Sequence, residues 1–440
     1  MSTRISRERV LASLPPPLMT LVETLAAKAS AAKADLYLVG GPVRDILLGR
    51  NPRDIDLLVV PSSRAGRIAR SAAPREAQVV EHGRFGTLRI QVPEGAIDLA
   101  GARTETYARP GALPKVRPGS LEEDLRRRDF TFNTLAIALT ERGSKPLEVR
   151  DVCNGVADLR AGRLRVLHPG SFHDDATRIL RAARLLPRLG FTLARPTHAA
   201  VRAALADDTF AGVSGDRLRR EFEKLFGDVS LGLDPVLALR LLARWGALSS
   251  LEAGLDWPKS AAAPMRRLGK ALAEPPWRTN RFRPWVPGLS VWLAPLRPAL
   301  RRRVLQRLSI RGDAEEHIAG FGQERGRILR RLEKARGRGA IDRALSGTGE
   351  ETLLALYACS EPLIRRRILR WAAEDRGRRA PLSGDDLLQL GLEGPALGSA
   401  LATIRAAHLD GAIANREEAT ALAVEWARRH AARSPGRKQR

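Results

Sequence analysis

The sequence contains few of the residues that define several common classes of protein. It has only two cysteines, Cys153 and Cys359, and neither these nor the seven histidines follow a metal-binding spacing. We therefore expect no disulfide framework, and a reducing cytoplasm is the simplest setting. No apolar run approaches the length of a membrane span, which argues against a membrane protein. Aromatic residues are also scarce, at 5% of the chain.

Positive charge is what the sequence has in excess. Its 75 Lys and Arg residues outnumber the 49 Asp and Glu residues, which gives a formal net charge of +26. Most of these cations are Arg, whose planar guanidinium group binds phosphate, so a polyanionic partner is favoured. A solvated surface in an arginine-rich proteome is the alternative. The length of 440 residues predicts two to four domains, and the abundance of Ala, Leu and Arg predicts a largely helical chain.

The N-terminal third alternates between the hydrophobic patterns of helices and strands. Residues 18–34 and 43–49 predict helices, whereas residues 35–41 and 54–60 predict strands, the first of which ends in a glycine turn. Two or three further strands are expected within residues 77–103. We therefore predict an α+β fold in which a small mixed sheet, flanked by a few helices, precedes an all-helical remainder.

The pattern becomes helical beyond this region. Residues 106–120 have the Pro and Gly content of a loop, and a helix is expected to start after Ser120. No convincing strand pattern remains after about residue 165. The Trp- and Pro-containing stretch 255–298 is interpreted as a joint between helical subdomains.

Two aspartates occur two residues apart in the strand predicted for residues 54–60. Side chains at alternate positions of a strand lie on the same face, so Asp54 and Asp56 are expected side by side. Adjacent carboxylates repel each other unless a cation neutralises them. The pair suits Mg²⁺, which binds one or two carboxylates together with substrate phosphates. Pairing with Arg50 and Arg53 is the alternative, and it would be preferred for an isolated Asp-x-Asp motif.

A glycine pair before these aspartates changes that preference. Gly40 and Gly41 end a predicted strand and open a helix, so their backbone N–H groups can approach phosphate oxygens. The segment LVGGPVRDILLGRNPRDIDLLV, residues 38–59, resembles the first motif of class II tRNA nucleotidyltransferases and bacterial poly(A) polymerases, within the polymerase-β-like nucleotidyltransferase superfamily. The resemblance implies that Asp54 and Asp56 hold Mg²⁺ and that four residues bind the nucleotide: Gly40, Gly41, Arg44 and Asp45.

A second segment, EEDLRRRDFTFNTLAI at residues 122–137, resembles the motif with which this family contacts the ribose and phosphates of the incoming nucleotide. The resemblance assigns that role to Arg127, Arg128, Asp129 and Asn133. Arg binds phosphate, and Asp129 or Asn133 can hydrogen-bond a 2′-hydroxyl group. A charged helix start, paired with nearby glutamates, is the alternative. Asp98, on a later strand, is a candidate third carboxylate that helps to activate the primer hydroxyl; an exposed strand residue is the alternative.

A third segment, SFHDDATRILRAARLLPRLGF at residues 171–191, resembles the motif with which the family selects its nucleotide. Asp175 and Arg178 match that motif, whereas Asp174 replaces its usual Glu. A carboxylate accepts from the exocyclic amine of cytosine or adenine, and Arg donates to a ring nitrogen, while uracil and guanine present a carbonyl instead. An ion pair three residues apart on one helix is the alternative. Arg181 and Arg184 continue the basic face.

The resemblance implies a nucleotidyltransferase that uses Mg²⁺ to add C and A, as CCA or part of it, from CTP and ATP to the 3′ end of tRNA. Three alternatives stay open: a poly(A) polymerase, an enzyme that adds only CC or only A, and an inactive RNA-binding protein. The oligomeric state is not assigned. The predicted division is a catalytic head at 1–165, a helical neck at 166–250, an RNA-binding body and tail at 251–425, and a disordered basic tail at 426–440.

Overall fold

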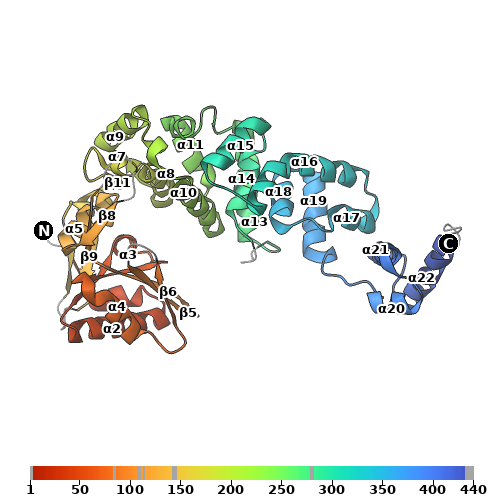
Figure 1. The fold of residues 1–440 in the computed structure, drawn as a ribbon, viewed down its shortest axis with the longest axis horizontal. Helices are drawn as coiled ribbons and strands as arrows, with labels where there is room; N and C mark the ends of the chain where they lie inside the picture. Colours follow the sequence, from red (N-terminus) through yellow and green to blue (C-terminus); the bar gives the residue numbers. More distant parts are fainter. Residues whose placement is uncertain are drawn as a thin grey trace, which may run out of the picture. The chain divides into compact units, whose positions relative to one another are not determined.

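The computed structural model describes residues 3–82, 86–106, 111, 114–140, 146–277 and 282–431. The chain divides into two compact units: the first unit is residues 1–217 with 241–253, and the second unit is residues 218–240 with 254–440 (Figure 1). Within the described residues, no helix is long and apolar enough to cross a membrane. Most of the predicted disordered tail and residues 107–110 and 112–113 of the predicted loop lie outside the described residues.

An eight-stranded mixed sheet forms the centre of the first unit, which confirms the predicted α+β fold. The strand order is β1-β10-β9-β2-β3-β6-β5-β4, in which β3 and β6 are the parallel neighbours. The eight strands are β1 (Arg4–Ile5), β2 (Asp35–Val39), β3 (Ile55–Val60), β4 (Gln78–His82), β5 (Thr87–Val92), β6 (Gly95–Gly101), β9 (Leu135–Ala138) and β10 (Leu147–Asp151).

Helices cover both faces of this sheet because its central strands are apolar on both sides. On one face, α2 and α4 pack against each other and against β2, β3 and β6. On the other face, Leu125 of α5 is fully buried in a cluster with Leu58 and Ala136. The first unit contains α1 (Arg7–Ala12), α2 (Pro16–Ala31), α3 (Gly41–Leu47), α4 (Ala65–Ala72), α5 (Leu121–Arg126), α6 (Gly155–Arg160), α7 (Ser171–Asp174), α8 (Thr177–Leu189), α9 (Arg195–Ala206) and α12 (Ala247–Leu251), with 3₁₀ turns η1 (Ser62–Arg64), η3 (Thr131–Asn133) and η4 (Thr209–Gly212).

Three local expectations differ from the structure. Part of the loop predicted at 106–120 is the strand β8 (Lys115–Pro118), which pairs with β7 (Arg103–Thr106). Beyond residue 165 one short strand remains, β12 (Thr192–Leu193), and it pairs in parallel with β11 (Arg163–Leu164). The basic segment 171–191 forms two helices, α7 and α8, with an extended residue between them. Short strands and single-residue breaks lack the periodicity from which longer elements are predicted.

The second unit is helical throughout the part that the structure describes. α10 (Gly215–Gly227) and α11 (Pro235–Trp245) cross the boundary between the units. The remaining elements are η5 (Asp228–Leu231), η6 (Lys259–Ala261), α13 (Ala262–Ala273), α14 (Trp285–Leu293), α15 (Pro298–Arg307), α16 (Asp313–Lys334), α17 (Gly337–Leu345), α18 (Glu350–Cys359), α19 (Pro362–Arg370), the π-helical η7 (Trp371–Asp375), α20 (Gly384–Gln389), α21 (Gly394–Leu409) and α22 (Arg416–Ala431).

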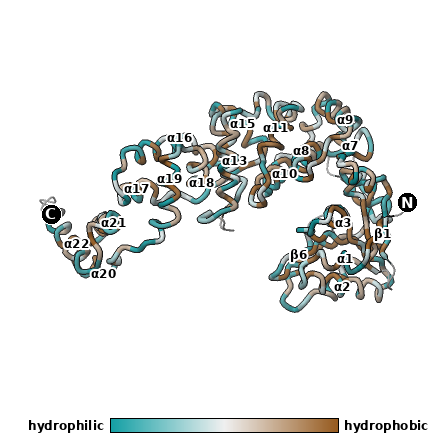
Figure 2. The backbone as a smooth tube through the Cα atoms, turned by 180° about the vertical axis from the view of Figure 1, so that it is seen from behind, coloured by the Kyte–Doolittle hydropathy of each residue, from teal (hydrophilic) through white to brown (hydrophobic). Residues whose placement is uncertain are grey.

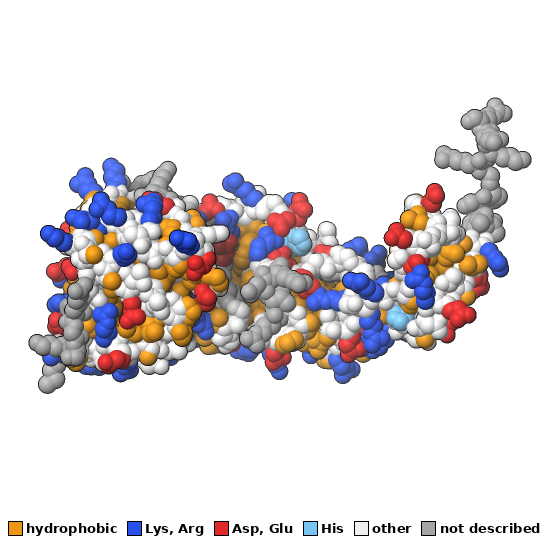
Figure 3. All heavy atoms as spheres, turned by 90° about the horizontal axis from the view of Figure 1, so that it is seen from below, with side chains coloured by type: hydrophobic (Ala, Val, Ile, Leu, Met, Phe, Trp, Pro, Cys, Tyr) orange, Lys and Arg blue, Asp and Glu red, His pale blue; other side chains and the backbone are white. Residues whose placement is uncertain are grey.

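The Trp-containing stretch that was interpreted as a joint belongs to the core of this second unit. Trp292 of α14 is fully buried, with its ring 5.5 Å from that of Phe222 and 6.4 Å from that of Trp257. α14 packs against α16 and α18, and all but one of its residues are buried. Figure 2 shows that apolar and polar residues alternate along the helices of both units. Lys and Arg side chains are spread over the face shown in Figure 3 and do not collect in one patch.

Candidate active site

The glycine turn between β2 and α3 makes room for an arginine. Gly40 has φ +74°, a conformation that favours glycine, and a Cβ atom there would lie 2.6 Å from Nη1 of Arg128. The N–H group of Gly40 donates to the carbonyl of Leu135 at 2.9 Å, so it belongs to the sheet. The space above this glycine is therefore used by the guanidinium group of Arg128.

Arg44 and Asp45 form a buried pair beside this turn. The Nε and Nη2 groups of Arg44 lie 2.8 Å from Oδ1 of Asp45, and Nη1 donates to Oδ1 of Asn133 at 3.0 Å. The Arg44 side chain is only 6% exposed. The structure thus brings together two predicted site segments, residues 40–45 and 127–133, that are far apart in the sequence.

Two of the candidate carboxylates, Asp56 and Asp98, lie side by side on the sheet, and the third, Asp54, is close enough for its charge to act on Asp56. Asp56 on β3 lies directly opposite Asp98 on β6 in the parallel register, and Asp54 immediately precedes β3. Asp56 and Leu58 are two residues apart in β3, so their side chains lie on the same face of the sheet. Leu58 packs against Leu125 of α5 on that face. Asp98 also receives two hydrogen bonds from Nη1 of Arg89, at 3.1 and 3.2 Å. Asp98 thus lies beside Asp56, and its role in activating the primer hydroxyl stays a prediction.

The pKa of Asp56 records this crowding. Burial raises it, and the negative charges of Asp98 and Asp54 raise it further, so that it reaches about 6 although Arg128 and Arg44 act in the opposite direction. Neighbouring carboxylates that repel one another favour the binding of a cation among them.

The carboxylate oxygens of this site suit a hard divalent cation whose coordination is completed by a substrate. Within the described residues, no group of three or more His, Cys, Asp or Glu side chains has the geometry to hold a metal by itself. Mg²⁺ does not require such a cage, because one or two carboxylates usually hold it together with substrate phosphates. Asp54 and Asp56 supply those oxygen ligands, and Asp98 lies in the neighbouring strand.

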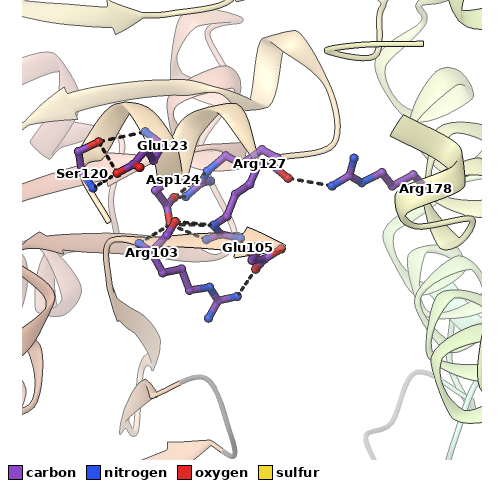
Figure 4. Close-up of polar contacts among 8 residues, drawn as sticks. Arg103, Glu105, Ser120, Glu123, Asp124, Arg127 and Arg178 are labelled. Atoms are coloured by element: carbon purple, nitrogen blue, oxygen red, sulfur yellow. Dashed lines mark hydrogen bonds and ion pairs between the residues drawn. The ribbon is translucent and has the colours of Figure 1, made fainter. Parts of the chain in front are cut away.

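A network of ion pairs holds the arginines of the second motif (Figure 4). Asp124 is completely buried, and its Oδ1 atom accepts from Nε of Arg127 at 3.0 Å. Its Oδ2 atom accepts from Nε of Arg128 at 3.3 Å and from Nη2 at 3.0 Å. Glu105 of β7 accepts from Nη1 of Arg127 at 2.9 Å and lies 3.2 Å from Nη2 of Arg103. Carboxylates therefore hold the guanidinium groups of both predicted arginines, Arg127 and Arg128, in place.

Asp129 and Asn133 lie in a second polar cluster close to Arg44. Oδ1 of Asp129 accepts from Nδ2 of Asn133, and its Oδ2 atom accepts from Nη1 of Arg181, both at 2.9 Å. Burial raises the pKa of Asp129, but Arg181, the Asn133 hydrogen bond and Arg178 outweigh it and lower the pKa to about 2. Arg184 is half-buried one turn further along α8.

The predicted base-selecting residues occupy the break between α7 and α8. Asp175 is extended, with φ −146°, and Arg178 lies in the first turn of α8, so the two do not share one helix as was expected. Oδ1 of Asp175 accepts from the hydroxyl of Thr177 at 2.6 Å and lies 2.8 Å from Nη2 of Arg217. Asp174 lies at the end of α7, with Oδ2 3.3 Å from Nε2 of His168.

Arg178 is buried and joins α8 to the second motif. Its Nη1 group donates to the hydroxyl of Ser171 at 2.6 Å. Its Nη2 group donates to the backbone carbonyl of Arg127 at 2.8 Å, a contact drawn in Figure 4. Asp175 and Arg178 thus have separate partners, in place of the ion pair between them that was the alternative. All three predicted motifs meet in the first unit, through Arg44 with Asn133 and through Arg127 with Arg178.

Sequence reasoning missed four residues that support this site: Arg89, Asp124, Ser171 and Arg217. Asp124 lies within the second motif, and its position three and four residues before two arginines was the available signal. Arg89 could have been found only from the register of β5 and β6. Nothing in the sequence pairs Arg217 with Asp175, which is 42 positions earlier in the numbering.

Comparisons with known proteins agree with these motifs. A family model described as the poly A polymerase head domain matches residues 36–165, which include the glycine turn, the three carboxylates and the second motif. An A-adding tRNA nucleotidyltransferase of Geobacter sulfurreducens is 30% identical over 430 residues, covering 94% of this chain and 48% of that protein. The chain therefore spans about half the length of that relative.

Two further relatives resemble the chain over other shares of their length. A CC-adding tRNA nucleotidyltransferase of Deinococcus radiodurans is 39% identical over 268 residues, covering 59% of this chain and 68% of that protein. The solved structure of a CCA-adding enzyme of Thermotoga maritima, complexed with tRNA, is 25% identical with a TM-score of 0.67. The likeness covers 97% of this chain and 100% of that one.

Proposed function

The chain belongs to the tRNA nucleotidyltransferase family, and from this premise we propose that it adds nucleotides from CTP and ATP to the 3′ end of tRNA without a nucleic-acid template. The observation that carries the proposal is the pairing of Asp56 with Asp98 on neighbouring strands, close to the charges of Asp54 and of Arg128, whose guanidinium group lies above Gly40. Such a grouping suits a cation and a triphosphate together.

In this proposal the 3′-hydroxyl of the tRNA attacks the α-phosphorus of the nucleotide. A bond forms between O3′ and phosphorus, the bond to the β-phosphate breaks, and pyrophosphate leaves. Asp98 accepts the hydroxyl proton, and Arg128 supplies positive charge to the triphosphate. Asp54 and Asp56 would hold Mg²⁺, which when bound makes the hydroxyl more acidic and neutralises charge on the phosphates.

Nucleotide choice is proposed to rest on Asp175 and Arg178. Within the described residues, the contacts of Arg178 to Ser171 and Arg127 use three of its five N–H groups. The other two, on Nε and Nη2, lie along one edge of the guanidinium group and can face a base. A carboxylate that faces the exocyclic amine of C or A would reject U and G, which present an acceptor there.

Contacts with the rest of the tRNA are proposed for the helical body and tail predicted at residues 251–425. Arg302, Arg303 and Arg366 are exposed on α15 and α19, where they can approach phosphates. This division, and the neck predicted at 166–250, form part of the same proposal.

An enzyme that adds only CC or only A is a second candidate, because relatives of both names resemble the chain. The test uses three tRNAs, which end at the discriminator base, at C and at CC. Each is incubated with Mg²⁺ and with CTP, ATP or both, and products are resolved at single-nucleotide length. Addition that stops after three nucleotides establishes CCA addition.

The other outcomes separate the remaining candidates. With both nucleotides supplied, addition that stops after two C residues, or addition of a single A to the tRNA ending in CC with no addition to the other two tRNAs, identifies a partial enzyme. A long ladder with ATP indicates a poly(A) polymerase. A folded protein that binds tRNA but adds nothing under any condition would contradict the enzymatic proposal.

A further inference from the structure

Asp124 is a completely buried carboxylate to which the proposed reaction gives no role. It accepts from side-chain groups of Arg127 and Arg128 and from the backbone N–H of Arg103 at 3.3 Å (Figure 4). The capping box of α5 fixes its helix, since Ser120 and Glu123 bond each other through both backbone and side chain. Its position is therefore determined from several sides.

The first consequence of these bonds concerns Arg128. Two of its N–H groups, Nε and Nη2, point to Asp124, and its Nη1 group is the atom that a Cβ at Gly40 would meet at 2.6 Å. The remaining nitrogen is thus directed over the glycine turn. Its charge also reaches the carboxylates, because Arg128 is the main influence that lowers the pKa of Asp56.

The second consequence concerns Arg178. Asp124 and Glu105 hold the guanidinium group of Arg127, and the backbone carbonyl of the same residue accepts from Nη2 of Arg178. Figure 4 shows this chain of contacts from α5 to α8. A shift of Arg127 would therefore move the acceptor that orients the arginine proposed to read the base.

We propose that Asp124 is a positioning residue of the nucleotide site, which acts through Arg128 on the triphosphate and through Arg127 on Arg178. Asp124 does not touch the nucleotide itself. This inference rests on the proposed function. A purely structural role would instead lower stability and leave the affinity for nucleotides unchanged.

The test compares Asp124→Asn and Asp124→Glu with a matched control, Asp158→Asn. Asp158 is also a buried aspartate of the first unit, and it accepts from Nε of Arg165 at 2.9 Å and from the hydroxyl of Thr131 at 2.8 Å. KM and kcat for CTP and ATP, the KM for tRNA, and equilibrium binding of each nucleotide are measured for all variants.

Both Asp124 variants are expected to raise the KM and the dissociation constant of the nucleotide by about tenfold, more for Asn than for Glu. The fall in kcat and the change in the KM for tRNA should be smaller. Asp158→Asn should lower the melting temperature without this rise in KM. In an Arg128→Gln background, Asp124→Asn should add little, because both substitutions remove the same interaction.

Unchanged nucleotide affinity in folded Asp124 variants would overturn the proposal. Should Asp124→Asn fail to fold, Asp124→Glu keeps the negative charge and carries the test. Failure of both variants to fold assigns Asp124 to the fold alone and also overturns it. Failure of the proposed function is a separate result, in which the wild-type protein adds no nucleotide, and direct binding of CTP and ATP still tests Asp124 in that case.

Discussion

The aspartates at β3 and β6 differ sharply from those in the segment 124–133, although both sets lie in the first unit. Asp56 and Asp98 lie opposite each other on parallel strands, with Asp54 nearby. Asp56 and Asp98 are half-buried, and Asp98 also accepts from Arg89. Asp124 and Asp129 are buried, and each is bonded to the guanidinium groups of arginines. One set gathers negative charge, and the other set neutralises positive charge.

The pKa values express this difference. Burial and two neighbouring carboxylates raise the pKa of Asp56 to about 6. For Asp129, burial acts in the same direction, but Arg181, Asn133 and Arg178 lower the pKa to about 2. Burial alone therefore does not identify a functional carboxylate; its charged partners decide whether it is available to a cation or already used by the protein.

The largest expected effect is the loss of activity in Asp56→Asn. Removing this charge should lower the rate of nucleotide addition by about 10²–10³-fold or more, because a ligand of the proposed cation is lost. The rate is measured with saturating CTP on a tRNA that ends at the discriminator base. The comparison requires that the variant stay folded, which thermal unfolding checks.

Asp35→Asn is the matched control for this prediction. Asp35 is an exposed aspartate on β2, the strand next to β3, and it faces Val60 in the antiparallel register. Its substitution should leave the rate within about twofold of wild type, since exposed positions contribute little. Equal losses in Asp35→Asn and Asp56→Asn would contradict the special role of the carboxylate face.

The next effect is on the free energy of unfolding, which should fall in Asp129→Asn but not in Asp56→Asn. Asp129→Asn should lower the free energy of unfolding by about 3 kcal/mol, because it removes the buried negative charge that accepts from Arg181. Asp56→Asn should not lower it at pH 7.5 without divalent cations, because it removes a desolvated and repelled charge. Urea unfolding of both variants measures the two values, and a similar loss in each would break the comparison.

The sequence predicted much of this arrangement, because its motifs are contiguous. The glycine turn, the strand that carries Asp56 and the helix start at Ser120 follow from spacing within about twenty residues, whereas Asp54 lies just before the strand in which it was predicted.

Contacts between distant segments could not be predicted in the same way. Arg89 meets Asp98 only because β5 and β6 pair in one register, and Arg217 meets Asp175 across a separation that no local pattern encodes. The extended residue between α7 and α8 was missed because the helical periodicity continues through it. Tertiary pairing, and not local propensity, decides which groups face each carboxylate.

The dependence of stability on pH should have opposite directions in the two sets. Because the folded pKa of Asp56 lies above its usual value of 3.8, its stabilising contribution is greatest at low pH and is lost as the pH rises from about 4 to about 6. The free energy of unfolding of Asp56→Asn should therefore exceed that of wild type by an amount that grows as the pH rises from about 4 to about 6, in buffer with EDTA.

For Asp129 the contribution is present above about pH 4 and is lost as the pH falls towards 2, because its folded pKa lies below the usual value. The deficit of Asp129→Asn relative to wild type should thus shrink in acid. Urea unfolding between pH 3 and pH 8 measures both trends. Parallel curves for the two variants would show that these carboxylates do not differ in their environment.

The smallest expected effect concerns the helix that presents Asp124. Ser120→Ala removes a capping box and should lower the free energy of unfolding by about 1 kcal/mol. Ser383→Ala removes the corresponding box of α20, in the second unit, and should cost a similar amount. Only Ser120→Ala should also raise the KM for nucleotides, by about twofold, because only α5 carries a residue that holds Arg127 and Arg128. Equal KM values in both variants would show that Asp124 is held by its arginines alone, and that the cap contributes to the fold without affecting the site.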